Sequence, residues 1–461
     1  MTSTTDLVGG PFAVIESDPG VFTSLTRRLG IRRLELVELY DIEPWAVDHL
    51  SPYGLIFCFM WRKDTHRPTD FNDPAAERVW FANQLSDDAC ATHAILNVLL
   101  NCPSIDIGDE LRAFRKETEH MSPVMRGLAI TNSPLIRPAH NSFARPSDIR
   151  SSLSSIATAT LDAIKRKEKQ RKEEAAAAKP PPAKRAKLTK APTKRKPKPK
   201  GKKKAADTET EEDTYHFIGY VPAHGKVWEL DGLKSGPLEV GELPTPPTHT
   251  YHTRSSSSSS TQPIDPESTH GWMDIARPAL RMKMDKYGGS GSDNSNIRFS
   301  LLAIVDDGYM TASDELELLK RERATIERRL EMGWDARVDQ ALLSAALTAF
   351  ELPHSGRTYA PDFGARKMER DMEIMKLGPE ELLAAWEECV RKAVAAKVGV
   401  EDEYSKGVRA NTDHVKRTFD YEPFIREYLR SLQEAGLLNP LLDRDSDGKK
   451  RRGRKAVAAK S

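Results

Sequence analysis

The pattern of apolar and polar positions predicts a sheet in the first two thirds of the chain. Residues 54–61 form a continuous apolar and aromatic run, which is typical of a strand buried on both faces. Two shorter strands, 215–221 and 226–231, are separated by Pro222–Gly225, which predicts a hairpin with a four-residue turn. A further strand is expected at 297–305.

The C-terminal third has a helical pattern instead. After Thr311, residues 315–331 carry apolar side chains at helical spacing and dense charge elsewhere, which predicts a long exposed helix. The pattern returns at 380–396 and at 421–438, and a separate helix is expected from Trp272. The chain therefore combines a mixed α/β part with a helical extension.

Two stretches break these patterns. Residues 165–212 consist mainly of Lys, Ala, Pro and Glu without an aromatic side chain, and such a composition predicts a disordered loop. A second loop at 244–270 contains six consecutive serines, and the last residues, 446–461, form a basic tail. From Lys165 to Lys204 there are 19 basic and 3 acidic residues, net +16, so the rest of the chain carries −14 of a total of +2.

Composition narrows the class of protein. Of the 461 residues, 38% are hydrophobic and 30% charged, without a run of 18 apolar residues and without a signal-like start, so we expect an intracellular protein without a membrane segment. The four cysteines form no CxxC pair, which argues against a zinc site or a disulfide framework. We expect neither a metal nor a cofactor.

Cys90 is the first candidate for chemistry. It follows Asp87 and Asp88 and precedes an apolar helical run, which places it at a helix N-terminus. Backbone N–H groups and the helix dipole stabilise a thiolate there, so a lowered thiol pKa is expected. The alternative, a small buried core cysteine, has about equal weight from this segment alone.

A nucleophilic cysteine needs a base, and twelve histidines are candidates. With a turn at Pro222–Gly225, the hairpin register places His216 directly opposite Asp231, where the carboxylate could orient the imidazole. The alternative is a surface His–Asp pair. Gln84, six residues before Cys90, could donate an amide hydrogen to an oxyanion, or could simply face solvent.

These residues also carry a resemblance. The segment Phe81-Ala-Asn-Gln-Leu-Ser-Asp-Asp-Ala-Cys-Ala-Thr92 resembles the active-site segment of the ubiquitin C-terminal hydrolases. Further segments resemble that family in the same order and together span most of residues 11–305: 16–22, 54–57, 127–129 with 132–133, 140–145, and His216 followed by 229–232.

The resemblance implies a papain-like α/β fold, with a central antiparallel sheet surrounded by helices and a crossover loop over the active site. It implies that Cys90 attacks, His216 is the general base, Asp231 orients it and Gln84 stabilises the oxyanion. The implied activity is hydrolysis of bonds at the C-terminal glycine of ubiquitin through an acyl-enzyme. The disordered Lys-rich insert lies where the crossover loop belongs, and its length could admit bulkier ubiquitin adducts.

The helices after residue 311 resemble the C-terminal extension of the long subfamily, which includes a proteasome-associated hydrolase and a chromatin-acting relative. From the N-terminus we expect a catalytic domain at 11–310, a helical extension at 311–400, an adaptor-binding helical domain at 415–445 and the basic tail at 446–461. The alternative for the helices is an ordinary pair packed on the catalytic body.

Function and location follow as expectations. We favour ubiquitin-dependent protein catabolism at the proteasome, with a proteasomal ubiquitin receptor as adaptor; the alternatives are a chromatin-acting histone deubiquitinase and a non-catalytic ubiquitin-binding scaffold. Residues 182–188 resemble a nuclear import signal and 449–455 could be a second, which predicts a nuclear and cytoplasmic protein. The same basic segments could contact nucleic acid nonspecifically.

Overall fold

A six-stranded antiparallel sheet organises the first two thirds of the chain. The computed structural model describes residues 11–60, 73–177, 215–244, 271–287, 299–351 and 358–442. The strand order is β1-β6-β2-β3-β4-β5, and every described pair is antiparallel. The strands are β1 (Leu34–Glu38), β2 (Gly54–Met60), β3 (Tyr215–Ala223), β4 (Lys226–Leu230), β5 (Leu238–Glu242) and β6 (Phe299–Asp306).

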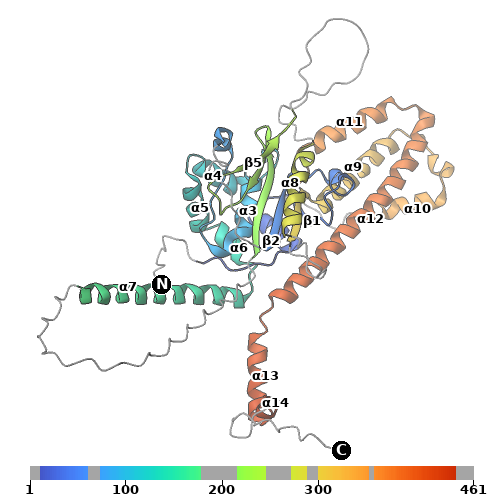
Figure 1. Cartoon of the computed structure of the whole chain (residues 1–461). Helices are drawn as coiled ribbons and strands as arrows, with labels where there is room; N and C mark the ends of the chain where they lie inside the picture. The colour runs from blue at the N-terminus through green and yellow to red at the C-terminus, as the bar shows by residue number, and fades with distance from the viewer. Residues whose placement is uncertain are drawn as a thin grey trace, which may run out of the picture.

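The helices fall into three groups, which Figure 1 shows around and beside the sheet. Those of the sheet domain are α1 (Pro19–Arg28), α2 (Pro44–Val47), α3 (Cys90–Leu99), α4 (Gly108–Thr118), α5 (Pro123–Asn132), α6 (Ile136–Asn141), α7 (Pro146–Ala177) and α8 (Trp272–Tyr287). Those of the extension are α9 (Gly308–Glu327), α10 (Gln340–Thr348), α11 (Phe363–Lys376) and α12 (Pro379–Thr418). Two more, α13 (Glu422–Glu434) and α14 (Leu438–Leu441), end the described chain.

Strand β2 is apolar throughout because helices cover both faces of the sheet. Ile56 belongs to a core with residues of α1 and α3, whereas Leu55 and Phe57 belong to a core with residues of α8. A strand buried on both faces has no polar side and therefore no alternation. The strand predicted at 54–61 is confirmed over residues 54–60, and Trp61 lies outside the described residues. The α/β class with a central antiparallel sheet is also confirmed.

The predicted hairpin forms, but its predicted register is wrong by two residues. Ala223 pairs with Lys226, so the turn consists of His224 and Gly225 alone. Both have positive φ, 53° and 77°, which is the backbone of a tight two-residue turn that matches strand twist. Pro222 lies inside β3, beyond the last residue that pairs with β2, where a strand can lack a donor.

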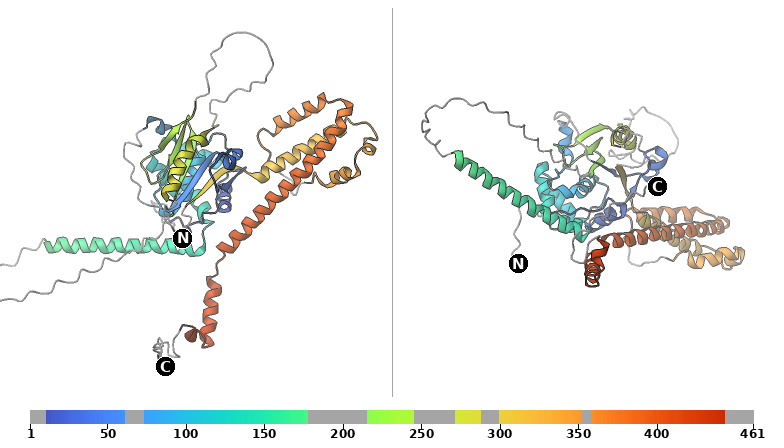
Figure 2. Two further views of the ribbon diagram at one scale, coloured as in Figure 1. Left: turned by 45° about the vertical axis from the view of Figure 1, so that its right-hand side comes forward. Right: turned by 60° about the horizontal axis from the view of Figure 1, so that its bottom comes forward.

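The helical extension has a hydrophobic core of its own. Helices α9, α10, α11 and α12 contribute to this core, which includes the fully buried Trp386. Ion pairs from Arg27 to Asp307 (2.5 Å) and from Arg33 to Asp314 (2.7 Å) join its first helix to the sheet domain. In both views of Figure 2, α13 lies beyond the end of α12 and away from the sheet.

Two predicted boundaries are wrong. Helix α9 begins at Gly308, capped by the Asp307 side chain, which accepts a hydrogen bond from the Met310 N–H, so Thr311 lies within the helix. Helix α7 continues to Ala177, so the disorder predicted for 165–177 is wrong, because Ala and charged residues are good helix formers. The remainder of that loop, most of 244–270 and the basic tail lie outside the described residues.

Candidate active site

Cys90 is the first residue of α3, as the sequence predicts, and α3 packs closely against the sheet at two glycines. A Cβ atom added at Gly219 of β3 would lie 2.6 Å from a methyl carbon of Val98, and one at Gly54 of β2 would lie 2.4 Å from its other methyl. Only glycine leaves room for this approach. The two glycines thus let α3 bring Cys90 close to β2 and β3.

The protonation state of Cys90 differs from the expectation. Burial raises the pKa of the Cys90 thiol to about 12, more than the N–H of Ala91 lowers it, and the nearby Cys58 and Asp88 add to the rise. The thiolate predicted from the helix start is therefore not the resting form in this structure. The thiol keeps its proton until a base removes it.

His216 and Asp231 form a buried hydrogen-bonded pair. Nε2 of His216 lies 2.7 Å from Oδ1 of Asp231, and the two residues are 3% and 6% exposed. His216 and Asp231 are not directly opposite each other, because the hairpin register differs from the predicted one by two residues. A shift of two residues leaves both side chains on the same face of the sheet, where residues that are offset by two are still within reach. The contact predicted from the sequence is present, and the surface-pair alternative is excluded.

The carboxylate of Asp231 is held in its charged form. Burial raises its pKa, but the hydrogen bond and charge of His216 and the N–H of Leu233 outweigh that effect, so the pKa lies below its usual value. A charged carboxylate on Nε2 fixes the proton there and leaves Nδ1 as the basic nitrogen.

Cys90 and His216 lie on two elements that pack against each other, α3 and β3. Cys58 in β2 pairs with Phe217, the neighbour of His216, and is near enough to Cys90 to affect its pKa. Among the described residues, no hydrogen bond joins the Cys90 sulfur to the His216 ring. Catalytic contacts are often long before substrate binds.

Gln84 lies at the end of an extended segment beside the same pair. Its backbone N–H donates to the Gly232 carbonyl (2.8 Å), one residue after Asp231. Its side-chain Nε2 donates to the Ser86 carbonyl (3.0 Å). The fold therefore brings Gln84 to the turn that follows the candidate triad, with its amide held by main chain.

Sequence reasoning missed two polar residues near this site. His140 is fully buried and bridges Thr92, two residues after Cys90, to the Ala13 carbonyl, with both contacts at 2.7 Å. Asn83 bonds the turn after Asp231. Both residues stand in segments that carried the family resemblance, 140–145 and 81–92, which was a usable signal, although no local pattern assigned a role to either.

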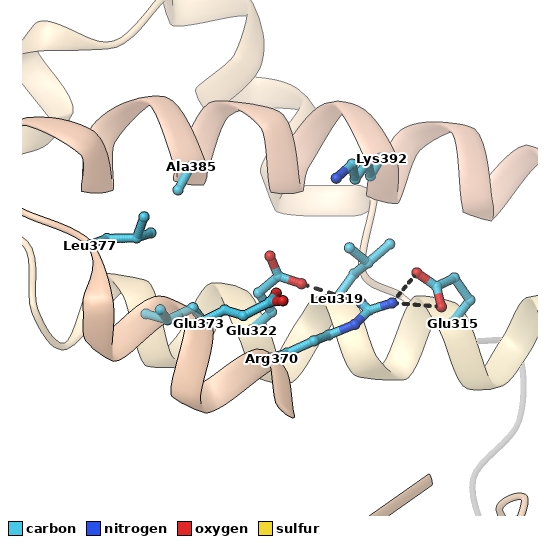
Figure 3. Close-up of a pocket in the computed structure, with 9 residues that line it drawn as sticks. Glu315, Leu319, Glu322, Arg370, Glu373, Leu377, Ala385 and Lys392 are labelled. Carbon is cyan, nitrogen blue, oxygen red and sulfur yellow. Dashed lines mark hydrogen bonds and ion pairs between the residues drawn. The ribbon is translucent and has the colours of Figure 1, made fainter. Parts of the chain in front are cut away.

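The described residues contain no cluster of side chains suited to a metal ion, and none of their helices is long and apolar enough to cross a membrane. A pocket of about 440 Å³ lies in the extension, between α9, α11 and α12 (Figure 3). Arg370 bonds Glu315 and Glu322 there. This pocket shares no residue with the candidate active site.

Comparison with known proteins identifies the family. The model of the family described as "Ubiquitin carboxyl-terminal hydrolase, family 1" matches residues 12–257. The chain belongs to this family. It is therefore a cysteine peptidase and a deubiquitinase, with ubiquitin conjugates as its substrates.

Several known proteins match this hydrolase over much of its length. It is 31% identical to ubiquitin carboxyl-terminal hydrolase isozyme L5 of Dictyostelium discoideum over 320 residues, 69% of each chain. It is 25% identical to the hydrolase calypso of Drosophila melanogaster over 445 residues, 93% of this chain and 74% of that one. The catalytic domain of Trichinella spiralis UCH37 bound to ubiquitin vinyl methyl ester is 26% identical, over 66% of this chain and 99% of that one, with a TM-score of 0.41.

Proposed function

We propose that Cys90, His216, Asp231 and Gln84 are the catalytic residues of this deubiquitinase. Nδ1 of His216 accepts the Cys90 proton as the sulfur adds to the carbonyl carbon of the ubiquitin C-terminal glycine. The side-chain amide of Gln84 turns away from Ser86 and donates a hydrogen bond to the resulting oxyanion. The intermediate then expels the leaving amine, which takes the proton from His216, and leaves a thioester on Cys90.

Water completes the reaction in the reverse sense. His216 takes a proton from water as the oxygen adds to the thioester, and the thiol leaves with that proton while ubiquitin departs as a carboxylic acid. Asp231 stabilises the imidazolium in both halves. The raised pKa of the Cys90 thiol gives the base a necessary role, because little free thiolate is available near neutral pH.

The observation that carries this proposal is the buried 2.7 Å bond between His216 and Asp231, on the strand beside the helix that begins at Cys90. The test compares wild-type protein with Cys90→Ala, each treated with ubiquitin vinyl methyl ester. A covalent adduct on the wild type alone is expected. An adduct on Cys90→Ala, or wild-type turnover by that variant, would show that another residue is the nucleophile; a wild type without adduct or turnover would favour the binding scaffold.

The C-terminal helix supports an adaptor as partner. Helix α13 has no buried residue, yet Phe424 and Tyr428, one turn apart, are 68% and 56% exposed and stack on each other. Ile425 and Leu429 are exposed beside them. Such an amphipathic helix fits an apolar groove of another protein. Within 415–445, α13 is the element that we assign to an adaptor, and a proteasomal ubiquitin receptor is the favoured class.

Fractionation of cell extract distinguishes the adaptor classes. Tagged wild-type protein is expected to co-purify with proteasomes, and the Phe424→Ala, Tyr428→Ala variant is not. Co-purification of the wild type with nucleosomes instead would favour the chromatin adaptor. Retention of either assembly by the variant would show that α13 is not the docking helix.

The basic segments support a nuclear and cytoplasmic location and weak nucleic-acid contact. Residues 182–188 and 449–455 lie outside the described residues, and the described part of α7 adds five cations between Lys165 and Arg171. Binding to duplex DNA of random sequence should weaken steeply with salt. Binding that survives 0.5 M salt would contradict a nonspecific contact.

A further inference from the structure

Asn83 lies immediately before Gln84, and its side chain is engaged entirely by the protein. Its Nδ2 donates to the carbonyl of Gly232 at 3.2 Å and to that of Lys234 at 2.6 Å. A side-chain amide nitrogen carries two hydrogens, so both are used on one short segment. The Gln84 backbone N–H bonds the same Gly232 carbonyl at 2.8 Å.

That segment is the turn that begins with Asp231. The Lys234 N–H donates to the Asp231 carbonyl (2.9 Å), which closes the turn, and the Leu233 N–H donates to Oδ1 of Asp231 (3.0 Å). Oδ1 is also the atom that faces His216. A displacement of this turn would therefore move the carboxylate on which the orientation of His216 depends.

The main chain before Asn83 is held on its other side by two helices. Asn97 of α3 exchanges hydrogen bonds with the backbone of Ala82, and the buried Arg126 of α5 donates to the Phe81 carbonyl. The Asn83 N–H itself donates to the Pro123 carbonyl at 3.0 Å. Helices α3 and α5 thus hold the backbone of residues 81–83 in place. The Asn83 side chain in turn bonds the turn 231–234 to this segment.

From this geometry we propose that Asn83 is a positioning residue, which fixes the oxyanion donor Gln84 relative to the His216–Asp231 pair. Asn83 contacts no reacting atom and acts through its neighbours. The inference rests on the roles proposed above for Gln84 and Asp231. Misplacement of catalytic groups by a fraction of an ångström lowers turnover without weakening ubiquitin binding, so the effect belongs in kcat.

The first test measures steady-state hydrolysis of ubiquitin with a C-terminal fluorogenic amide by full-length variants. Asn83→Ala is expected to lower kcat about 10-fold and to change KM less than about twofold. Asn83→Asp should lower kcat further, because a carboxylate in that place faces two carbonyl oxygens without a donor. Asn83→Gln keeps the amide and should recover part of the loss.

Matched controls separate positioning from folding. Ser344→Ala removes one exposed side-chain hydrogen bond, to the Gln340 carbonyl in α10, and should leave kcat and KM unchanged. The melting temperature of Asn83→Ala is measured beside it. The proposal would be overturned if the unfolded fraction of Asn83→Ala accounts for its whole loss of kcat. It would also be overturned if Asn83→Ala raises KM and leaves kcat unchanged.

A double-mutant cycle with Gln84→Ala gives the sharper test. If Asn83 acts through Gln84, adding Asn83→Ala to Gln84→Ala should lower kcat by less than about twofold. Independent, multiplying effects would overturn the proposal even if Asn83→Ala alone is slow. If Cys90→Ala is inactive and Gln84→Ala slow while Asn83→Ala equals wild type, the positioning role alone fails; if Cys90→Ala remains active, the proposed function fails as well.

Discussion

The sheet domain buries the polar side chains of its candidate active site, whereas helix α13 exposes its apolar side chains. In the sheet domain, His216 and Asp231 are 3% and 6% exposed and bonded to each other. In α13, Phe424 is 68% exposed and no residue is buried. The polar groups of the candidate triad are inside, and the apolar groups of α13 are outside.

The two arrangements have different consequences for the free energy of the molecule. Buried, bonded polar groups keep one geometry, which chemistry requires, because leaving any of them unpaired costs free energy. An exposed apolar face gains free energy only when something covers it. The polar groups of the buried pair have their partners inside the sheet domain, whereas the apolar side chains of α13 are exposed to solvent.

The largest expected effect tests the buried pair. Asp231→Asn keeps the shape but loses the charge that fixes the His216 tautomer, so kcat on a fluorogenic ubiquitin amide should fall about 10³- to 10⁴-fold. Asp109→Asn, at an exposed position of α4, is the matched control and should retain wild-type kcat. A loss below about 10-fold for Asp231→Asn would mean that burial of the pair does not serve the reaction.

Acid should destabilise the sheet domain through its buried histidines. Burial lowers the pKa values of His93 and His140 to about 4, from about 6.5 in the unfolded chain. Between these values the unfolded state binds protons that the folded state does not, so stability falls as pH drops from about 7 to 4. At pH 5 each of the two histidines should lower the free energy of unfolding by about 2 kcal/mol relative to neutral pH.

Urea unfolding at pH 7.5 and pH 5 measures this loss. His93→Gln removes one of the two groups, so its loss between the two pH values should be about 2 kcal/mol smaller than that of the wild type. Equal losses in the two proteins would show that His93 is not the group that titrates.

The close packing of α3 on the sheet should appear as a stability effect. Gly219→Ala places a methyl group 2.6 Å from Val98 and should lower the free energy of unfolding by about 1–3 kcal/mol. Gly364→Ala in α11 meets no atom within 4 Å and should be neutral or stabilising by about 0.5–1 kcal/mol. Equal effects of the two would argue against the tight contact.

The smallest expected effect belongs to α13. The double variant Phe424→Ala, Tyr428→Ala should change the free energy of unfolding by no more than about 0.5 kcal/mol, because neither side chain is buried. Its kcat on the fluorogenic ubiquitin amide should equal that of the wild type. A lowered melting temperature or kcat in the isolated protein would contradict the contrast between the two regions, because α13 would then serve the sheet domain.

Much of this arrangement was predictable from local sequence. The apolar run of β2, the hairpin around residues 215–231 and the helix that begins at Cys90 all follow from patterns within a few residues. The pairing of His216 with Asp231 was also predicted, although by a wrong register. That error did no harm, because a shift by two residues leaves every side chain on its face.

Other features could not be predicted locally. Pro222 suggested a turn because proline has no backbone N–H to donate to a neighbouring strand. In the structure this lack does no harm, because Pro222 lies where β3 extends past β2. Where that happens depends on the length of β2, which no pattern near Pro222 contains. The pKa of Cys90 depends on burial by distant segments, which outweighs the helix start. No local pattern assigned a role to Asn83, although it stands in the segment that carried the family resemblance, because its partners, Gly232 and Lys234, are about 150 residues away.

The sequence by itself predicted the candidate catalytic residues, several of the strands and helices, and the resemblance to the family. Each of these depends on residue types at short spacing, where propensity, periodicity and motif act. Only the tertiary structure decided that burial raises the pKa of the Cys90 thiol, that Asp231 bonds His216 despite the shifted register and that no described residue of α13 is buried. Burial and the ends of strands depend on distant segments that meet in space, and no local pattern contains them.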